Sequence, residues 1–301
     1  MELLVNPTSY SNALELIKLG VHQICVGTKE FSLRNNCLLT IKQIEELIKN
    51  KKQTKILILV NRLYFDPELP ELAKYILAIS KLNIDGIIFS DFGINQICFE
   101  NNLKVNLIYN PETLVTNFGQ FDFYKENNIG EVALARELNV NQIKEIASNK
   151  KDMKIQVQVG GHALMMHSRW SLLSNYQATQ KDQTNITHQT AIIREVSRKE
   201  PSIIYEDEYG TYVFTNYDLS LYDKLDELKQ MHVDTVRIDS FLHDEDWVIK
   251  TAKWFLKGVS EINSVDLKQY ENDFQQFNLS HGFYNMNKHD LVYLLKEDVY
   301  E

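Results

Sequence analysis

Cysteine is scarce in this sequence. Its 301 residues include three cysteines, Cys25, Cys37 and Cys98, which are far apart and form no CxxC motif. An odd number of isolated cysteines argues against a disulfide framework and against a metal site built from thiolates. The cysteine content is therefore typical of a protein that folds in a reducing compartment.

Long apolar runs and an excess of basic residues are also missing. No apolar run approaches the roughly 18–20 residues that cross a bilayer, and the opening MELLVNP has neither the basic nor the apolar region of a signal peptide. We therefore expect a cytoplasmic protein with no membrane partner. The 32 Lys and Arg residues are outnumbered by 41 Asp and Glu residues, for a net charge of −9. This balance argues against a free-standing nucleic-acid-binding protein, which normally presents a concentrated basic face.

Short apolar runs alternate with helical patterns along most of the chain. The helical patterns carry end signals: Ser11–Leu19 stops at Gly20, and Ile41–Lys49 follows a Thr40–Gln43 capping box. The eight runs expected to form strands are Glu2–Val5, Gln23–Val26, Lys55–Val60, Gly86–Phe89, Lys104–Ile108, Glu131–Leu134, Lys154–Val159 and Thr235–Ile238. Eight strands separated by helices predict an α/β fold of the (β/α)8 type, a TIM-like barrel. A doubly wound open sheet is the alternative, but no GxGxxG follows the first strand.

The alternation is interrupted between the seventh and eighth expected strands. Residues 161–217 contain a polar segment and the alternating run YEDEYGTYVF, whose Gly-containing turn predicts a β-hairpin. We interpret these residues as a β-rich insertion within a barrel domain that spans residues 1–256. Residues 257–301 then form a short, polar, partly helical C-terminal tail.

Polar residues follow the expected strands, where the loops of such barrels build their sites. These residues are Arg34, Asn61, Arg62, Asp91, Asn110, Arg136, Glu137, His162 and Asp239. Arg34 and Arg136, with Arg169 of the insertion, would face one mouth, and guanidinium groups bind carboxylates or phosphates in a bidentate manner. The sequence thus favours a site for a small anion. The alternative is that these arginines pair with neighbouring acids and brace the loops.

The segment GGHALMMHSRWSLLSNY, residues 160–176, concentrates further polar side chains. Its two histidines, His162 and His167, are five residues apart, which does not place them on one helix face, and no HExxH motif is present. We therefore expect no metal site. No GxSxG nucleophile elbow is present either, and the members of a Ser/His/Asp triad need only meet in space.

Several segments together resemble one protein family. In order along the chain they are MELLVNPTSYSNALELIKLGVHQICVGTKEFSLR, ILILVNRLYFDPEL, IDGIIFSDFG, LVTN, VALARELNVNQIKEI, GHALMMHSRWSLLSNY and NYDLSLYDKLDELKQMHVDTVRID. They cover most of residues 1–256 and resemble the collagenase-like peptidases of unassigned catalytic type, the "U" peptidase family. The FSLR and ALAREL pieces and the LLSNY loop, in this order, are the specific part of the match.

The chain departs from this family in its cysteines. Members typically carry one cysteine before the LLSNY loop, one at its start and a further pair downstream, and in several members these four hold an iron–sulfur cluster. The first two positions are Leu164 and Ser171 here, and no cysteine follows Cys98. Leu and Ser cannot replace thiolate ligands, so we expect no cofactor in this chain. It resembles a short subgroup from Gram-positive bacteria, free of the cluster cysteines, whose presumed partner is a longer, cluster-bearing paralogue.

The resemblance implies two activities. The older label is a collagen-degrading peptidase with no agreed nucleophile. The other activity is oxygen-independent hydroxylation, either of ubiquinone precursors or of the wobble uridine of tRNA to 5-hydroxyuridine, with prephenate involved.

Three functions remain open on these observations. In the first, the chain is the subunit without an iron–sulfur cluster in tRNA uridine hydroxylation; it binds the paralogue and a dicarboxylate such as prephenate, and meets tRNA only through the complex. Its candidate substrate-binding residues are Arg34, Asn61, Arg136, Arg169, Asn175 and Tyr176. In the second it is a peptidase whose acid–base candidates are His162, His167, Asp91 and Glu137. In the third it is an inactive scaffold for the paralogue, so that removing the charges of Arg34 and Arg136 has no effect in vivo.

Overall fold

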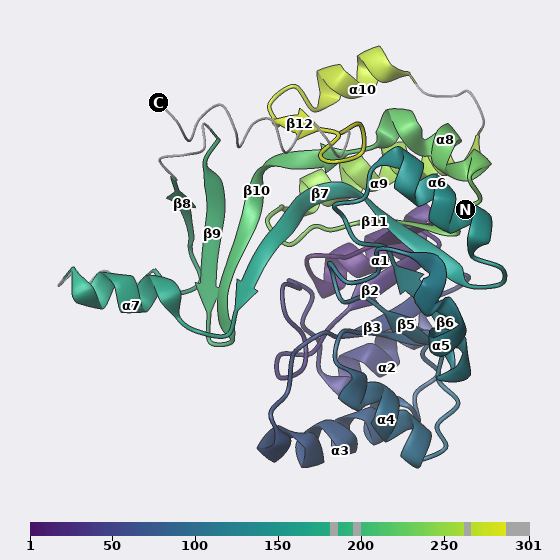
Figure 1. Cartoon of the computed structure of the whole chain (residues 1–301), viewed down its shortest axis with the longest axis vertical. Coiled ribbons are helices and arrows are strands. Elements are labelled where there is room, and N and C mark those ends of the chain that lie inside the picture. The colour runs from purple at the N-terminus through teal and green to yellow at the C-terminus, as the bar shows by residue number, and fades with distance from the viewer. Residues whose placement is uncertain (181–185, 195–199, 262–265, 287–301) are drawn as a thin grey trace.

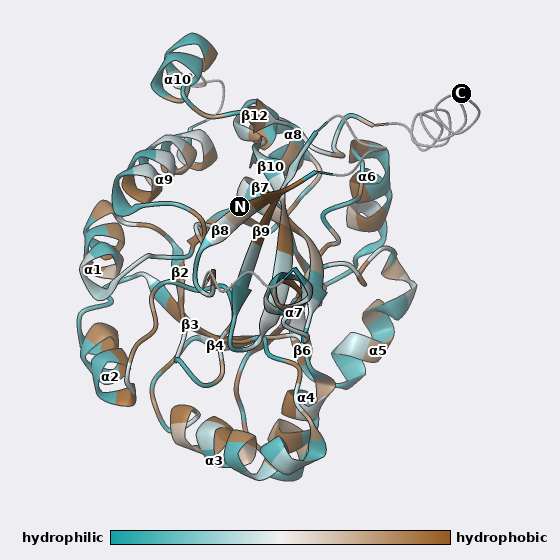
Figure 2. Ribbon diagram, turned by 90° about the vertical axis from the view of Figure 1, so that its left-hand side faces the viewer, coloured by the Kyte–Doolittle hydropathy of each residue, from teal (hydrophilic) through white to brown (hydrophobic). Residues whose placement is uncertain are grey.

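The computed structural model describes residues 1–180, 186–194, 200–261 and 266–286. Eight parallel strands close into a barrel with helices around its outside (Figures 1 and 2). The barrel strands are β1 (Glu2–Val5), β2 (Gln23–Val26), β3 (Lys55–Val60), β4 (Gly86–Phe89), β5 (Leu107–Tyr109), β6 (Ile129–Ala133), β7 (Lys154–Ser168) and β11 (Thr235–Ile238). β1 to β7 pair in chain order, and β11 closes the barrel by pairing with both β1 and β7. The predicted (β/α)8-type fold is confirmed.

The predicted bounds agree with the observed strands except in β5, β6 and β7. β5 begins at Leu107 rather than Lys104, and β6 begins at Ile129 rather than Glu131. The largest difference is in β7, which was expected to end at Val159 but continues to Ser168. Residues 160–168, which lie beyond the predicted end of this strand, therefore belong to it, because the antiparallel strand β10 satisfies their backbone hydrogen bonds.

Helices cover the outside of the barrel. They are α1 (Tyr10–Leu19), α2 (Ile41–Lys49), α3 (Leu69–Ile79), α4 (Phe92–Glu100), α5 (Phe121–Glu126), α6 (Val140–Asn149), α8 (Leu225–Gln230) and α9 (Glu245–Ser260). The predicted end signals are present: Gly20 ends α1 in the left-handed conformation with φ 83°, and Thr40 and Gln43 form a capping box on α2. Within the described ranges, no helix has both the length and the apolar character needed to cross a bilayer.

The insertion extends β7 into an antiparallel sheet. β7 pairs with β10 (Gly210–Ser220), β10 with β9 (Ser202–Asp207), and β9 with β8 (Thr190–Ile193). β9 and β10 are the predicted hairpin, and together with α7 (Leu172–Thr179) they project from one side of the barrel (Figure 1). Residues 181–185 and 195–199 of the insertion lie outside the described residues.

The C-terminal segment continues from the barrel without a break at residue 256, since α9 runs to Ser260. It adds α10 (Leu267–Asp273) and β12 (Leu279–Ser280), and β12 pairs with β10 of the insertion. Residues 262–265 and 287–301 of the expected tail lie outside the described residues.

Gly161 marks the point where β7 leaves the barrel. Its φ is +84°, and a Cβ atom there would lie 1.7 Å from the carbonyl oxygen of Asp239. No side chain fits so close to backbone, so only glycine lets β7 pass the end of β11 and continue into the insertion.

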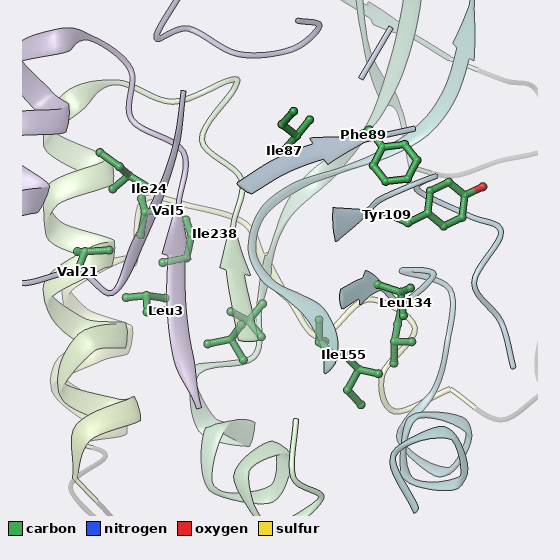
Figure 3. Packing of buried hydrophobic residues seen from close by; sticks show 14 of the residues in the cluster. Leu3, Val5, Val21, Ile24, Ile87, Phe89, Tyr109, Leu134, Ile155 and Ile238 are labelled. Carbon is green, nitrogen blue, oxygen red and sulfur yellow. The ribbon is translucent and has the colours of Figure 1, made fainter. Parts of the chain in front are cut away.

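The barrel strands separate two buried layers. On their outer side, Leu3, Val5 and Ile238 pack toward the helices, next to Val21 and Ile24 (Figure 3). The alternate positions face the barrel interior and form a separate apolar cluster of Leu4, Cys25, Leu57, Leu59, Ile88 and Ile108. On β6, β7 and β11 the buried polar residues are Glu131, Gln156, Gln158, Thr235 and Arg237. One half of the interior is therefore apolar and the other polar.

Candidate functional site

A buried carboxylate joins two of the predicted arginines at the mouth of the barrel. Glu112, in the loop after β5, accepts a hydrogen bond from Arg34 at 2.8 Å on Oε1 and from Arg136 at 2.8 Å on Oε2. The side chains are 7% exposed in Arg34, 5% in Arg136 and 17% in Glu112. Ion pairs so shielded from water are much less screened than surface pairs, so this cluster is a strong local electrostatic feature.

A third arginine adds to the positive charge. Burial would raise the pKa of Glu112, but Arg34, Arg237 and Arg136 outweigh burial and lower that pKa to about 2. Asp239 responds in the opposite direction: burial raises its pKa, although Arg237 opposes the shift. The cluster therefore has three guanidinium groups around one carboxylate that is fully ionised at neutral pH, and Asp239 is the weaker acid beside them.

Two guanidinium nitrogens in this cluster lack hydrogen-bond partners. Among the described residues, the Nε atoms of Arg136 and Arg237 are buried and donate to no protein atom. A buried donor without an acceptor costs about 1–3 kcal/mol. Such donors favour an additional acceptor, such as a ligand oxygen, at the mouth.

The backbone holds this ion pair in an uncommon conformation. Arg34 has a φ of 52° and Glu112 a φ of 69°, both in the left-handed region that non-glycine residues rarely occupy. Asn61 fixes the first loop, since its side chain accepts from the N–H of Leu33 at 2.7 Å and donates to the Leu33 carbonyl at 3.2 Å. Asn110 accepts from the Glu112 N–H at 3.3 Å. Backbone strain of about 1–3 kcal/mol per residue that is held by such contacts is typical of functional sites.

A cavity of about 250 Å³ opens beside the cluster. It is lined by Arg34, Asn61, Leu63, Ser90, Pro111, Glu112, Thr113, Arg136, Leu164, Met165, Met166 and His167. One part of the lining is charged and the rest is mostly apolar, a combination that suits a small organic anion with a hydrophobic body.

His167 lines this cavity as a neutral side chain. Its ring stacks on Tyr212 with the centroids 4.6 Å apart, and its Nε2 is buried without a partner among the described residues. Burial and the charge of Arg34 lower its pKa to about 4. At neutral pH, His167 can therefore donate or accept a hydrogen bond with a ligand but adds no positive charge.

A larger cavity of about 410 Å³ lies at the opposite end of the barrel, where the strands begin. Several charges there are already paired, as in Lys55–Glu2 and Lys51–Asp85, each at 2.7 Å. The sites of (β/α)8 barrels form at the C-terminal ends of the strands. We therefore take the smaller cavity beside Glu112 as the candidate site.

The structure brings together only part of the predicted substrate-binding set. Arg34, Arg136 and Asn61 line the cavity with His167. Arg169 points elsewhere: its guanidinium lies over the Phe65 ring, 3.7 Å from the centroid, and 3.4 Å from the Glu68 carboxylate. Asn175 and Tyr176 lie exposed on α7, which projects from the barrel (Figure 1).

The four acid–base candidates are dispersed, and no hydrogen bond between any two of them is observed. Asp91 caps α4: one carboxylate oxygen accepts from the Gly93 N–H at 2.8 Å and the other from the Tyr64 N–H at 3.0 Å. Glu137 is exposed in a turn. His162 contacts Asp218 and His243 instead of the cavity beside Glu112. These four residues therefore do not assemble into one catalytic group.

Two residues central to the site were not predicted. Glu112 lies two positions beyond Asn110, the residue predicted for the loop after β5. Arg237 alternates with Val236 and Ile238 in TVRID, so the period of two places it on the inner face of β11. That alternation was a visible signal for Arg237, whereas nothing in the sequence pairs Glu112 with arginines 78 and 24 residues away.

Comparison with known proteins identifies the family. The sequence model of peptidase family U32 matches residues 8–292. The chain belongs to peptidase family U32. The resemblance predicted from FSLR, ALAREL and LLSNY is thereby confirmed at the level of the family.

Two relatives carry informative names. The U32 chain is similar to the "tRNA hydroxylation protein P2" of Bacillus subtilis (strain 168), with 27% identity over 264 residues, 86% of this chain and 85% of that protein. The "tRNA hydroxylation protein P1" of the same organism is 23% identical over 255 residues, 81% of this chain and 60% of that protein. Among solved structures, the U32 peptidase Mk0906 has a TM-score of 0.48 and 12% identity, covering 79% of this chain and 91% of that chain.

The two positions where we expect U32 members to carry cysteine, Leu164 and Ser171, differ from each other in burial in this chain. Leu164 is 6% exposed and packs with Leu33, Tyr212 and Phe214. Ser171 is exposed directly before α7. The helix is tied to the hairpin by buried Glu206, which accepts from the Leu173 N–H at 2.8 Å, the Ser174 N–H at 3.2 Å, the Ser174 hydroxyl and Thr211 Oγ1 at 2.7 Å. The segment is held by apolar packing and hydrogen bonds.

Proposed function

We propose that this U32 protein acts in tRNA uridine hydroxylation and that the cavity beside Glu112 binds a small dicarboxylate, with prephenate as the candidate. The observation that carries the proposal is the group of Arg34, Arg136 and Arg237 around one ionised carboxylate at the mouth of the barrel. The names of the two Bacillus subtilis relatives support tRNA hydroxylation, and uridine as the target is what the family resemblance implies.

Glu112 illustrates how the site would hold a ligand carboxylate. Its two oxygens each accept from a different arginine at 2.8 Å, so the guanidinium groups are already oriented for planar carboxylate recognition. Arg136 lines the cavity and its Nε has no partner among the described residues, so it can donate to a further oxygen, whereas Arg237 does not line the cavity and contributes its charge. The apolar lining by Leu63, Leu164 and Met166 suits the carbon skeleton of such a ligand.

We assign the chain the role of the subunit without an iron–sulfur cluster. Leu164 and Ser171 supply no thiolate, and the chain has no cysteine after Cys98. The net charge of −9 opposes tight binding of tRNA by this chain alone, since such binding depends on neutralising phosphates. A longer, cluster-bearing paralogue would therefore provide both the redox centre and most of the tRNA contacts.

The proposal is tested by nucleoside mass spectrometry of total tRNA from a strain that lacks this gene. The deletion should remove 5-hydroxyuridine and its derivatives, and the wild-type gene should restore them. Arg136→Ala should fail to restore them and Arg136→Lys should restore them poorly, because lysine keeps the charge but loses the fork of donors. Lys74→Ala, which removes an exposed ion pair with Glu71, is the matched control and should restore them fully.

Each result has a distinct meaning. If Arg136→Ala restores the modification as well as wild type does, the arginine cavity has no part in the activity and the scaffold function stands instead. If deletion never changes the tRNA, the role in hydroxylation is wrong. Calorimetric titration of prephenate into the purified chain, alone and with its paralogue, tests the ligand separately, and a loss of at least tenfold in affinity is expected for Arg136→Ala.

A further inference from the structure

Three side chains from separate elements converge at one point beside the insertion. His162 lies on β7, Asp218 on β10, and His243 in the turn before α9. His162 and Asp218 are opposite each other in the antiparallel ladder, which places their side chains on the same face of the sheet. Among the described residues, only these three bring histidine, cysteine or carboxylate ligand atoms together as a trio, all within 4.8 Å of one another.

The two imidazoles face the same carboxylate oxygen. His243 Nε2 is 2.6 Å from Asp218 Oδ1, and His162 Nε2 is 3.8 Å from that atom. The side chains are 13% exposed in His162, 4% in Asp218 and 5% in His243. The donor atoms are therefore shielded from bulk water.

The hydrogen bond made by His162 fixes which of its ring nitrogens carries the proton. Its Nδ1 lies 2.9 Å from the carbonyl oxygen of Thr215, which can only accept a hydrogen bond, so Nδ1 carries the proton. In the neutral ring Nε2 is then an acceptor that faces the Asp218 carboxylate. Metal-binding histidines are commonly held by this kind of hydrogen bond from the other ring nitrogen to a carbonyl.

Asp218 also lacks a permanent counter-charge. Within the described part of the chain, its partners in ion pairs are the two histidines, and no Lys or Arg lies within 4.0 Å. A buried carboxylate is costly unless it is paired with positive charge. His243 is fixed by stacking on Trp247, with centroids 3.6 Å apart and planes at 5°, so its ring is pre-positioned at the carboxylate.

We propose that His162, Asp218 and His243 bind one divalent transition-metal ion such as Zn²⁺. The distances from Asp218 Oδ1, 2.6 Å and 3.8 Å, lie on either side of the roughly 3–3.5 Å that separates ligand atoms around zinc at about 2.0–2.2 Å, and all three ligand atoms lie within 4.8 Å of one another. Two imidazoles and a carboxylate suit zinc and the neighbouring first-row metals. On binding, His243 Nε2 gives up to solvent the proton that it shares with Asp218, the neutral ring holds its proton on Nδ1, and water or a ligand oxygen completes the coordination.

This site is separate from the arginine cavity and does not depend on the proposed function. It concerns residues that the sequence did not connect: no metal was expected from His162 and His167, whereas the ligands here come from positions 162, 218 and 243. The site lies on the strand that also lines the cavity, two residues before Leu164.

The test uses the full-length, tag-free chain after treatment with EDTA and buffer exchange. Calorimetric titration with Zn²⁺ should show one saturable equivalent, and Co²⁺ should give the visible absorption of a site with imidazole ligands. His243→Ala and Asp218→Asn should each lower the Zn²⁺ affinity at least tenfold and change the Co²⁺ spectrum. His281→Ala is the matched control, because His281 also pairs with a single carboxylate, Asp223, at 2.9 Å but has no second histidine.

The wild-type measurements decide the matter even if a variant fails to fold. Absence of a saturable equivalent of Zn²⁺ in the wild-type chain overturns the proposal. Binding that is unchanged in both His243→Ala and Asp218→Asn, or is lost equally in His281→Ala, overturns it as well. Asp218→Asn keeps the size of the side chain, and circular dichroism establishes that the variant is folded before its affinity is interpreted.

Discussion

Replacing Glu112 by glutamine removes the one ionised carboxylate between Arg34 and Arg136 with little change in shape. The pKa of Glu112 is lowered from 4.5 to about 2. A difference of one unit corresponds to about 1.4 kcal/mol, so the ionised carboxylate contributes about 3 kcal/mol to folding at neutral pH. We expect Glu112→Gln to lower the free energy of unfolding by at least this amount, because two buried guanidinium groups also lose their partner.

The contribution of Glu112 to the free energy of unfolding should fall as the pH is lowered. The folded-state pKa of Glu112 is lower than the unfolded-state value, so its contribution is complete above pH 4.5 and is lost as the pH falls toward about 2. The difference in unfolding free energy between wild type and Glu112→Gln should therefore be constant from pH 7 to about pH 5. At pH 3.5 it should be smaller by roughly 1 kcal/mol.

Urea unfolding followed by circular dichroism, repeated at each pH, measures this difference. Glu71→Gln is the control, because Glu71 is 70% exposed in its pair with Lys74 and its loss should change stability by less than about 0.5 kcal/mol. A Glu112→Gln variant as stable as wild type at pH 7 would refute the reasoning. So would a difference that is the same at pH 7 and pH 3.5.

Three further predictions concern the insertion and the cavity. Gly161→Ala should cost roughly 2–5 kcal/mol of unfolding free energy, because its Cβ would meet a backbone oxygen at 1.7 Å. The control is Gly20→Ala, where φ is also positive but nothing lies within 4 Å, and its cost should be about 1 kcal/mol. Equal costs for the two variants would contradict the clash. Glu206→Gln should cost about 1–3 kcal/mol and speed hydrogen exchange at the start of α7, because two backbone N–H groups lose a carboxylate acceptor, whereas the exposed Glu208→Gln should not. In NMR, the His167 ring should titrate with a pKa of about 4. Because this pKa is lower than the unfolded-state value of 6.5, the contribution of the neutral ring to the free energy of unfolding should be complete above pH 6.5 and be lost as the pH falls toward 4. A titration midpoint above about 6 would contradict burial in the cavity.

The sequence alone determined the order of the barrel. Strand runs such as Ile56–Val60 and Ile87–Phe89 are continuous apolar segments, and end signals such as Gly20 act over a few residues. Such signals are local, so they can be recognised in the sequence without knowledge of the fold. The order of the strands also predicted that Arg34 and Arg136 lie at the mouth, because each lies in the loop after a strand of a parallel barrel.

Tertiary structure alone decided which side chains meet. β7 continues to Ser168 because a strand about 50 residues later in the chain pairs with it, and no local pattern in residues 160–168 carries that information. Glu112 joins Arg34 and Arg136 only when the loops after separate strands converge, while Arg169 lies over Phe65 instead. His162, Asp218 and His243 likewise meet only in the folded chain, across a separation of 81 residues. Local propensity acts over a few residues, whereas packing selects partners by their position in space. The site of this protein depends on packing.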